Sequence, residues 1–80
     1  MRRLGLAPGS AAQRSVMATV RAIAGDAALP GHADFETAFS PGRANVRRVS
    51  GHNLWVLYRF DESHVDILTV RDEPPVPVDA

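Results

Sequence analysis

The sequence predicts a single α+β domain in which an N-terminal helix, or a helical hairpin, packs on an antiparallel sheet of three or four strands. Two observations support this fold class. Apolar residues recur at helical spacing near the N-terminus, and apolar segments joined by short turns follow in the second half. A chain of 80 residues is long enough for one domain only. Because the chain has no cysteine, neither disulfides nor thiolate-bound metals can support the fold.

The first predicted element is a helix over residues 11–24. Ser10 stands at the N-cap position, and Gly25 follows the last helical residue. Between them, apolar residues spaced by four, four and three positions form one helix face: Ala12, Val16, Val20 and Ile23. This face is too large to remain in water, so we expect it to pack on the sheet. Residues 1–9 carry weak signals, and we expect them to be weakly ordered or to form an edge strand.

Residues 25–44 are expected to connect the helix to the sheet. They contain two Pro-Gly turn signals, one near each end. Between these turns, Phe35 and Phe39 are spaced for either one helical turn or one face of a strand, and Asp34 would cap the helix in the first alternative. In both alternatives we expect the two phenylalanine rings to help close the core.

Three strands are predicted after the connector, over residues 45–49, 53–60 and 64–71. The turns between them are short, so neighbouring strands must be antiparallel. The middle strand is apolar on both faces and is therefore expected at the centre of the sheet, with Leu54, Val56 and Tyr58 on one face and Trp55 and Leu57 on the other. The helix can cover one of these faces. We expect the other face to be partly covered by the connector or to bind a partner.

The end of the chain has two further features. Strict alternation along the last strand places Val65 and Val70 on opposite faces. Residues 72–80 contain three prolines, which exclude a central strand or a helix. We therefore expect an extended, mobile tail.

Positive charge is unevenly distributed, although nine basic and nine acidic residues cancel overall. Arg47 and Arg48 are consecutive and must project to opposite faces of their strand. At most one of them can therefore share a face with Arg43 or Arg59. Guanidinium groups gathered on one face would bind phosphate. The alternative is a solvated strand whose arginines pair with the acids.

Histidine and tyrosine are the other candidates for chemistry. His32, His52 and His64 could act as general acids or bases near neutral pH, but their spacing does not suggest a metal site. His52 and His64 lie in or beside predicted turns, where histidine is usually a surface residue. Tyr58 is first a core residue, although on an exposed face its ring would stack on a base. No cofactor is indicated.

Residues 47–71 resemble the C-terminal half of toxins of the RelE/ParE superfamily, the toxin halves of bacterial type II toxin–antitoxin pairs. The shared pattern is an arginine-bearing strand and a tight turn, followed by Leu57-Tyr58-Arg59-Phe60, an acidic turn, and Val65-Asp66-Ile67-Leu68-Thr69-Val70-Arg71. The loop Leu29-Pro30-Gly31-His32 is similar to the family's loop after the helices. The resemblance implies a RelE/ParE-like sheet with helices on one face.

The resemblance also implies a function. The chain would inhibit bacterial growth and be neutralised by a cognate antitoxin. RelE-like members cleave ribosome-bound mRNA, whereas ParE-like members inhibit DNA gyrase and are not enzymes, so the resemblance leaves enzymatic activity open. The implied catalytic residues are Arg47, Arg48 and Arg71, which would stabilise phosphate charge because a guanidinium group is a poor proton shuttle. The remaining candidate contacts to substrate or partner are Arg43, Tyr58, Arg59 and His64.

Three features distinguish the chain from RelE-type ribonucleases. It has no lysine, its sequence pI is about 6.8, and Asp72-Glu73-Pro74-Pro75 follows Arg71 where a tyrosine or histidine is frequent. These features favour the ParE-like branch or a non-catalytic protein-interaction module on the same scaffold. The sequence contains no apolar run long enough to span a membrane, and the stretch after Met1-Arg2-Arg3 is too short and broken for a secretory signal. We therefore expect a cytoplasmic protein, and a homodimer is left open.

Overall fold

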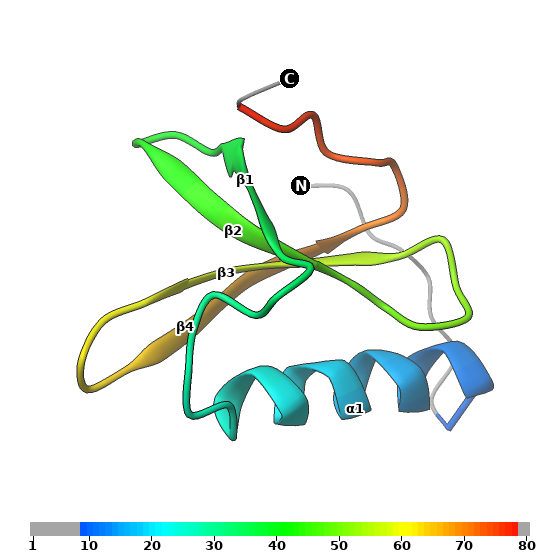
Figure 1. Ribbon diagram of the computed structural model, residues 1–80. Coiled ribbons are helices and arrows are strands. Elements are labelled where there is room, and N and C mark those ends of the chain that lie inside the picture. Colours follow the sequence, from blue (N-terminus) through cyan, green and yellow to red (C-terminus); the bar gives the residue numbers. More distant parts are fainter. Residues whose placement is uncertain (1–8, 79–80) are drawn as a thin grey trace.

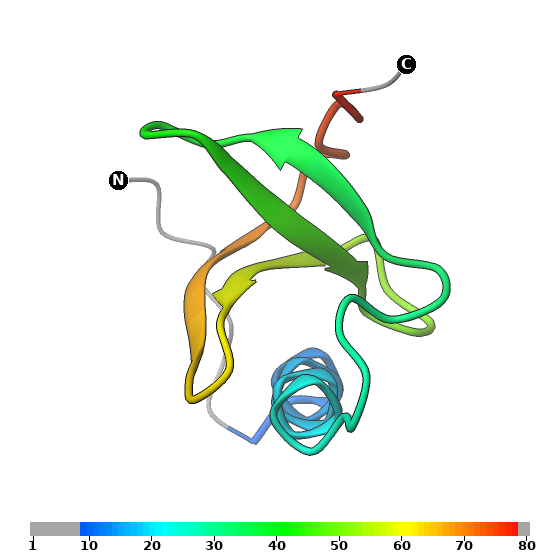
Figure 2. The ribbon, with the colours of Figure 1, turned by 60° about the vertical axis from the view of Figure 1, so that its left-hand side comes forward.

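The computed structural model describes residues 9–78, and its elements are one helix followed by four strands (Figure 1). These elements are α1 (Ala11–Ala24), β1 (Phe35–Ala38), β2 (Arg43–Arg48), β3 (Trp55–Phe60) and β4 (Val65–Arg71). The strands form one antiparallel sheet in the order β1-β2-β3-β4, and α1 lies against one face of it (Figure 2). The predicted α+β class is confirmed, and of the alternatives left open the described residues form one helix and a four-stranded antiparallel sheet. The expectation for residues 1–9 falls almost wholly outside the described residues.

Helix α1 has the predicted bounds, cap and apolar face. The Ser10 hydroxyl oxygen accepts a hydrogen bond from the Gln13 N–H at 3.1 Å, which satisfies one of the free donors of the first turn. At the other end, the Gly25 N–H donates to the Arg21 carbonyl at 2.9 Å. The predicted apolar residues all pack in the cluster between helix and sheet: Ala12, Val16, Val20 and Ile23.

The sheet has an apolar cluster on each face, because β3 is apolar on both sides. The helix-side cluster is built from Val16 and Ile23 of α1 together with Val49, Leu54, Val56 and Tyr58. The opposite face, which we call the open face, carries a smaller cluster of Ala44, Val46 and Leu57, flanked by Phe35, Phe39, Trp55 and Leu68. The alternation predicted for β3 and its central position are confirmed.

Part of the predicted connector forms strand β1. Phe35 begins β1 and lies opposite Val46 in β2, so Phe35 and Phe39 both contact the open-face cluster. Spacing alone fits a helical turn equally well. The neighbouring strand decides the outcome, because β2 supplies backbone partners along the whole of β1.

The strict alternation predicted for the last strand is wrong, because β4 contains a bulge. Leu57 lies opposite Thr69, but Tyr58 lies opposite Ile67, so Leu68 is an extra residue in the ladder. As a result, Val65 and Val70 both pack on the helix-side cluster, although strict alternation would separate them. Leu68 contacts the open-face cluster instead.

The tail is extended, as expected, but its described part is packed against the sheet rather than free. Pro77 lies opposite Thr37 in an antiparallel bridge, and the Val78 N–H donates to the Glu36 carbonyl at 3.0 Å. The Thr37 hydroxyl donates to the Val76 carbonyl at 2.8 Å, and Pro75 is buried. The chain therefore returns from the end of β4 to the outer edge of β1 (Figure 1).

Candidate functional site

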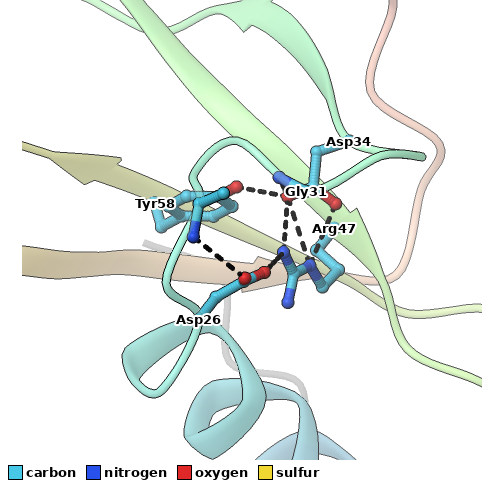
Figure 3. Close-up of polar contacts among 6 residues, drawn as sticks. Asp26, Gly31, Asp34, Arg47 and Tyr58 are labelled. Atoms are coloured by element: carbon cyan, nitrogen blue, oxygen red, sulfur yellow. Dashed lines mark hydrogen bonds and ion pairs between the residues drawn. The ribbon is translucent and has the colours of Figure 1, made fainter.

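The carboxylate of Asp34, directly before β1, is the centre of a polar network on the helix side of the sheet (Figure 3). Its side chain is only 3% exposed. The Arg47 guanidinium donates to it through Nε, 2.9 Å from Oδ1, and through Nη2, 2.9 Å from Oδ2. The Gly31 N–H donates to Oδ2 at 2.9 Å, and the Tyr58 hydroxyl donates to the same oxygen. The buried charge is therefore fully hydrogen-bonded, which is what makes its burial tolerable.

Arg47 joins the two ends of the loop between α1 and β1. Its Nη2 atom also donates to Asp26 Oδ2 at 3.1 Å, and Asp26 follows the C-terminal cap of the helix. One guanidinium group thus holds both Asp26 and Asp34 against β2. The Arg47 side chain is 17% exposed and lies on the face that α1 covers, away from the open face.

The network fixes the protonation of its members. Burial raises the pKa of Asp34, but hydrogen bonds from Arg47, Tyr58 and Gly31 together lower it further, so it lies below its usual value. The hydrogen bond to Asp34 raises the pKa of Arg47 above its already high value. Burial, followed by the bond to Asp34, raises the pKa of Tyr58 to about 12. At neutral pH, Asp34 is therefore ionised, Arg47 is protonated and Tyr58 keeps its phenolic proton. Groups with fixed protonation suit a network that stabilises the fold.

Tyr58 is expected to titrate at about pH 12, and this can be measured directly because the chain has one tyrosine. The folded state holds the phenolic proton more tightly than the unfolded chain, whose tyrosine titrates near pH 10. Stability is therefore fully present below about pH 10 and falls as the pH rises toward about 12. Phenolate absorbance gives the midpoint, and the chain in denaturant is the reference. If the folded and the denatured chain show the same titration midpoint for Tyr58, the hydrogen bond from Tyr58 to Asp34 is contradicted.

Tyr58 is unavailable as a contact to a partner. It is 0% exposed, and its ring packs in the helix-side cluster. The alternative in which the ring stacks on a base requires exposure on an open face, so the burial corrects the placement of Tyr58 among the binding residues.

Arg59 holds the turn between β1 and β2. Its Nε donates to the Arg43 carbonyl at 2.9 Å, and its Nη2 donates to the carbonyls of Phe39 and Pro41, each at 2.7 Å. The guanidinium carbon also lies 5.5 Å from the centre of the Phe39 ring. These contacts use the guanidinium group within the chain. Arg43 itself is exposed, with Nη1 4.0 Å from Glu36 Oε1.

Three side chains form a row across the open face: Arg48, Trp55 and Arg71. Arg48 lies directly opposite Trp55, and Trp55 lies directly opposite Arg71, so the three project from the same face. Both arginines are exposed and Trp55 is half-buried. Arg48 Nη2 donates to Asn53 Oδ1 at 3.3 Å, and the Arg71 guanidinium carbon lies 5.6 Å from the centre of the Phe39 ring. We call these three residues the open-face row.

The open-face row brings together two of the three arginines that the resemblance implies as catalytic. As expected, Arg47 and Arg48 project to opposite faces, so Arg47 does not join the row. Sequence reasoning did not select Trp55, although its place opposite two arginines follows from the strand register. Chemically, the row can bind an anion through two guanidinium groups and can present a flat apolar surface between them.

The histidines are placed on turns. His64 lies on the turn between β3 and β4, exposed, with Nδ1 3.7 Å from Asp61 Oδ1. Backbone N–H groups of Ser63 and His64 donate to the Asp61 carboxylate and lower its pKa. This turn follows the C-terminal end of β3, whereas the open-face row crosses β3 at its first residue, Trp55. His52 lies on the turn between Arg48 and Trp55, at the same end of β3 as the row.

Within residues 9–78, no group of three or more histidine, aspartate or glutamate side chains is placed to hold a metal ion. The one described helix is too short and too polar to cross a membrane. Comparisons with protein-family models, with curated proteins and with solved structures found no match to this chain.

Proposed function

We propose that the chain is a growth-inhibiting toxin of the RelE/ParE type that acts by binding its target through the open-face row. The observation that carries this proposal is the alignment of Arg48, Trp55 and Arg71 across three neighbouring strands on the face opposite the helix. A cognate antitoxin would neutralise the chain by covering the same face. The target is ribosome-bound mRNA in a RelE-like mechanism and DNA gyrase in a ParE-like one.

The arrangement of the arginines favours binding over RNA cleavage. Cleavage through the ribose 2′-hydroxyl needs a base, an acid and cations around one phosphate. Arg47 and Tyr58 are tied to Asp34 on the helix side of the sheet. Arg59 is tied to the β1–β2 turn, and the chain contains no lysine. The open-face row thus supplies charge and a stacking surface, which are the requirements of recognition.

Expression of the chain alone in a bacterium is expected to arrest growth, and the double substitution Arg48→Ala/Arg71→Ala is expected to relieve the arrest. Removing both guanidinium groups leaves the fold intact, because both are exposed, but it removes the anion-binding part of the row. The matched control is Arg21→Ala, which changes an exposed arginine on α1. Colony counts after induction measure the effect at equal soluble protein levels.

Several outcomes would contradict this proposal. Normal growth with well-expressed wild-type chain would contradict toxicity, and full toxicity of the double variant would contradict the role of the row. Primer extension on messages from arrested cells separates the branches. Cuts at codons would show RNA cleavage and overturn the binding mechanism, whereas a DNA-damage response without cuts would support gyrase as the target.

A protein-interaction module on the same scaffold, without toxicity, is the second candidate. It is favoured by the docked tail, which lines a groove beside Arg71 and covers part of the open face. This candidate predicts normal growth on induction together with a stable complex with another protein chain. The same expression experiment therefore distinguishes the two candidates.

A further inference from the structure

We propose that a pocket on the helix side of the sheet, at the Arg43 end of β2, binds a free α-amino acid with an aromatic side chain. The pocket has a volume of about 660 Å³, which suits a small molecule. None of its described lining residues belongs to α1 or to the open-face row, so the proposal is independent of toxicity. We call it the zwitterion pocket, and the residues that give it a binding chemistry are Glu36, Arg43, Asn45 and Phe60.

The strand register places these side chains on one face. Glu36 lies directly opposite Asn45, and Asn45 lies directly opposite Tyr58, so the three project to the helix side. Arg43 precedes Asn45 by two positions in β2, and Phe60 follows Tyr58 by two positions in β3, so alternation gives them the same face. The ring centres of Tyr58 and Phe60 lie 6.2 Å apart, in agreement with this placement.

The zwitterion pocket offers one negative and one positive group to a ligand. Arg43 Nη1 lies 4.0 Å from Glu36 Oε1, which is longer than a hydrogen bond, and the two side chains are 60% and 48% exposed. The other charged residues that line the pocket are already bonded, Asp34 to Arg47 and Arg59 to backbone carbonyls of the β1–β2 turn. Glu36 and Arg43 therefore keep hydrogen-bonding capacity for a ligand.

Asn45 adds a donor and an acceptor beside these two charges. Its side chain is half-buried, and within residues 9–78 its amide group forms no hydrogen bond. The amide carries an acceptor oxygen and a donor NH₂ group. A free α-amino acid presents an ammonium donor and a carboxylate acceptor on one carbon atom. It therefore matches Asn45, with its ammonium toward Glu36 and its carboxylate toward Arg43.

The apolar part of the zwitterion pocket selects the side chain of the amino acid. Phe60 is 38% exposed, and Pro30 of the loop before β1 lines the same pocket. An aromatic ring packs on Phe60 in an offset or edge-to-face arrangement and removes exposed apolar surface from water. L-phenylalanine is therefore the probe of choice.

NMR titration of the full chain with L-phenylalanine and two blocked analogues tests the ligand chemistry. N-acetylphenylalanine lacks the ammonium charge, and phenylalaninamide lacks the carboxylate. We expect L-phenylalanine to shift the amide signals of residues 36, 43, 45 and 60. Each analogue is expected to bind about fivefold more weakly or worse, because it loses a charged hydrogen bond. An analogue that binds as tightly as L-phenylalanine would overturn the proposal and assign the pocket to a peptide terminus.

Two substitutions pair each charge of the zwitterion pocket with one analogue. Glu36→Gln is expected to weaken L-phenylalanine about fivefold and to leave N-acetylphenylalanine unchanged, because that analogue has no ammonium group. Arg43→Met is expected to weaken L-phenylalanine similarly and to leave phenylalaninamide unchanged. Asn45→Ala weakens L-phenylalanine, whereas the matched control Asn53→Ala, at an exposed asparagine on the β2–β3 turn, leaves its binding unchanged.

Three results would overturn the proposal. Absence of shifts at millimolar L-phenylalanine would show that the wild-type chain does not bind the amino acid. Shifts confined to other residues would place the amino acid elsewhere. If Glu36→Gln weakens N-acetylphenylalanine as much as L-phenylalanine, Glu36 does not bind the ammonium group. Amide spectra of the free variants show that the fold is retained in each comparison.

Discussion

Arg47→Met is expected to destabilise the domain by about 3–5 kcal/mol, the usual cost of removing one partner of a buried ion pair. The substitution leaves the Asp34 carboxylate, 3% exposed, without its two strongest donors, and it releases Asp26 as well. Small domains are stable by roughly 5–15 kcal/mol, so much of the stability is lost. Urea unfolding followed by Trp55 fluorescence measures the change, because the chain has one tryptophan.

The neighbouring residue provides the matched control. Arg48→Met makes the same chemical change one position along β2, on the exposed open face, and is expected to change stability by about 0.5 kcal/mol or less. Equal effects of the two substitutions would contradict the structural role of the Asp34 network. Adding Asp34→Asn to Arg47→Met is expected to recover part of the loss, because the unpaired buried charge is then removed.

Gly31→Ala is expected to destabilise the domain by about 1–3 kcal/mol, the range for steric overpacking. A Cβ atom at this position would lie 2.2 Å from Arg47 Nη2 and 3.0 Å from Asp34 Oδ2. At most positions with an ordinary φ angle, replacing glycine by alanine stabilises a protein by about 0.4–1 kcal/mol through the unfolded state. At Gly31 the substitution is expected to lower the free energy of unfolding instead, because the Arg47 guanidinium group fills the space beside the glycine. Urea unfolding again gives the change.

A double-mutant cycle tests the cause of this loss. If the added methyl group acts by displacing Arg47, Gly31→Ala should cost much less when Arg47 is already methionine. If the two losses in unfolding free energy simply add, the loss caused by Gly31→Ala arises from the backbone of the loop and not from Arg47. Gly25→Ala is the companion control, since a Cβ atom there meets the Arg21 carbonyl at 3.3 Å and contacts neither Arg47 nor Asp34.

The parts of the fold that the sequence predicted are those set by local pattern. Helix α1 follows from the Ser10 cap and the apolar residues up to Ile23, and β3 follows from apolar residues on both of its faces. Strand β1 could not be chosen over a helical turn, because Phe35 and Phe39 satisfy both periods. The bulge at Leu68 arises from the pairing of β3 with β4 and leaves no signal in β4 alone.

The candidate site was less predictable because its contacts span long sequence separations. Asp34 meets Arg47 across 13 positions and Tyr58 across 24, so its role as a network centre depends on the packing of the loop on the sheet. Sequence reasoning assigned Asp34 only a capping role. The open-face row could have been predicted from a correct strand register, which places Trp55 opposite both Arg48 and Arg71. The docking of the tail on β1 depends on a turn after Arg71 that no local motif specifies.

The adjacency of Arg47 and Arg48 in β2 has a consequence for how the hairpins align during folding. Sliding β2 by one position along β3 would exchange the two residues, bringing Arg48 toward Asp34 and sending Arg47 outward. The same slide would carry Val46 from the open-face cluster to the helix side, and it would place the polar side chain of Asn45 in the open-face cluster. Two identical side chains in succession thus do not make a one-position slide acceptable, because the slide places Asn45 and Val46 on the wrong faces.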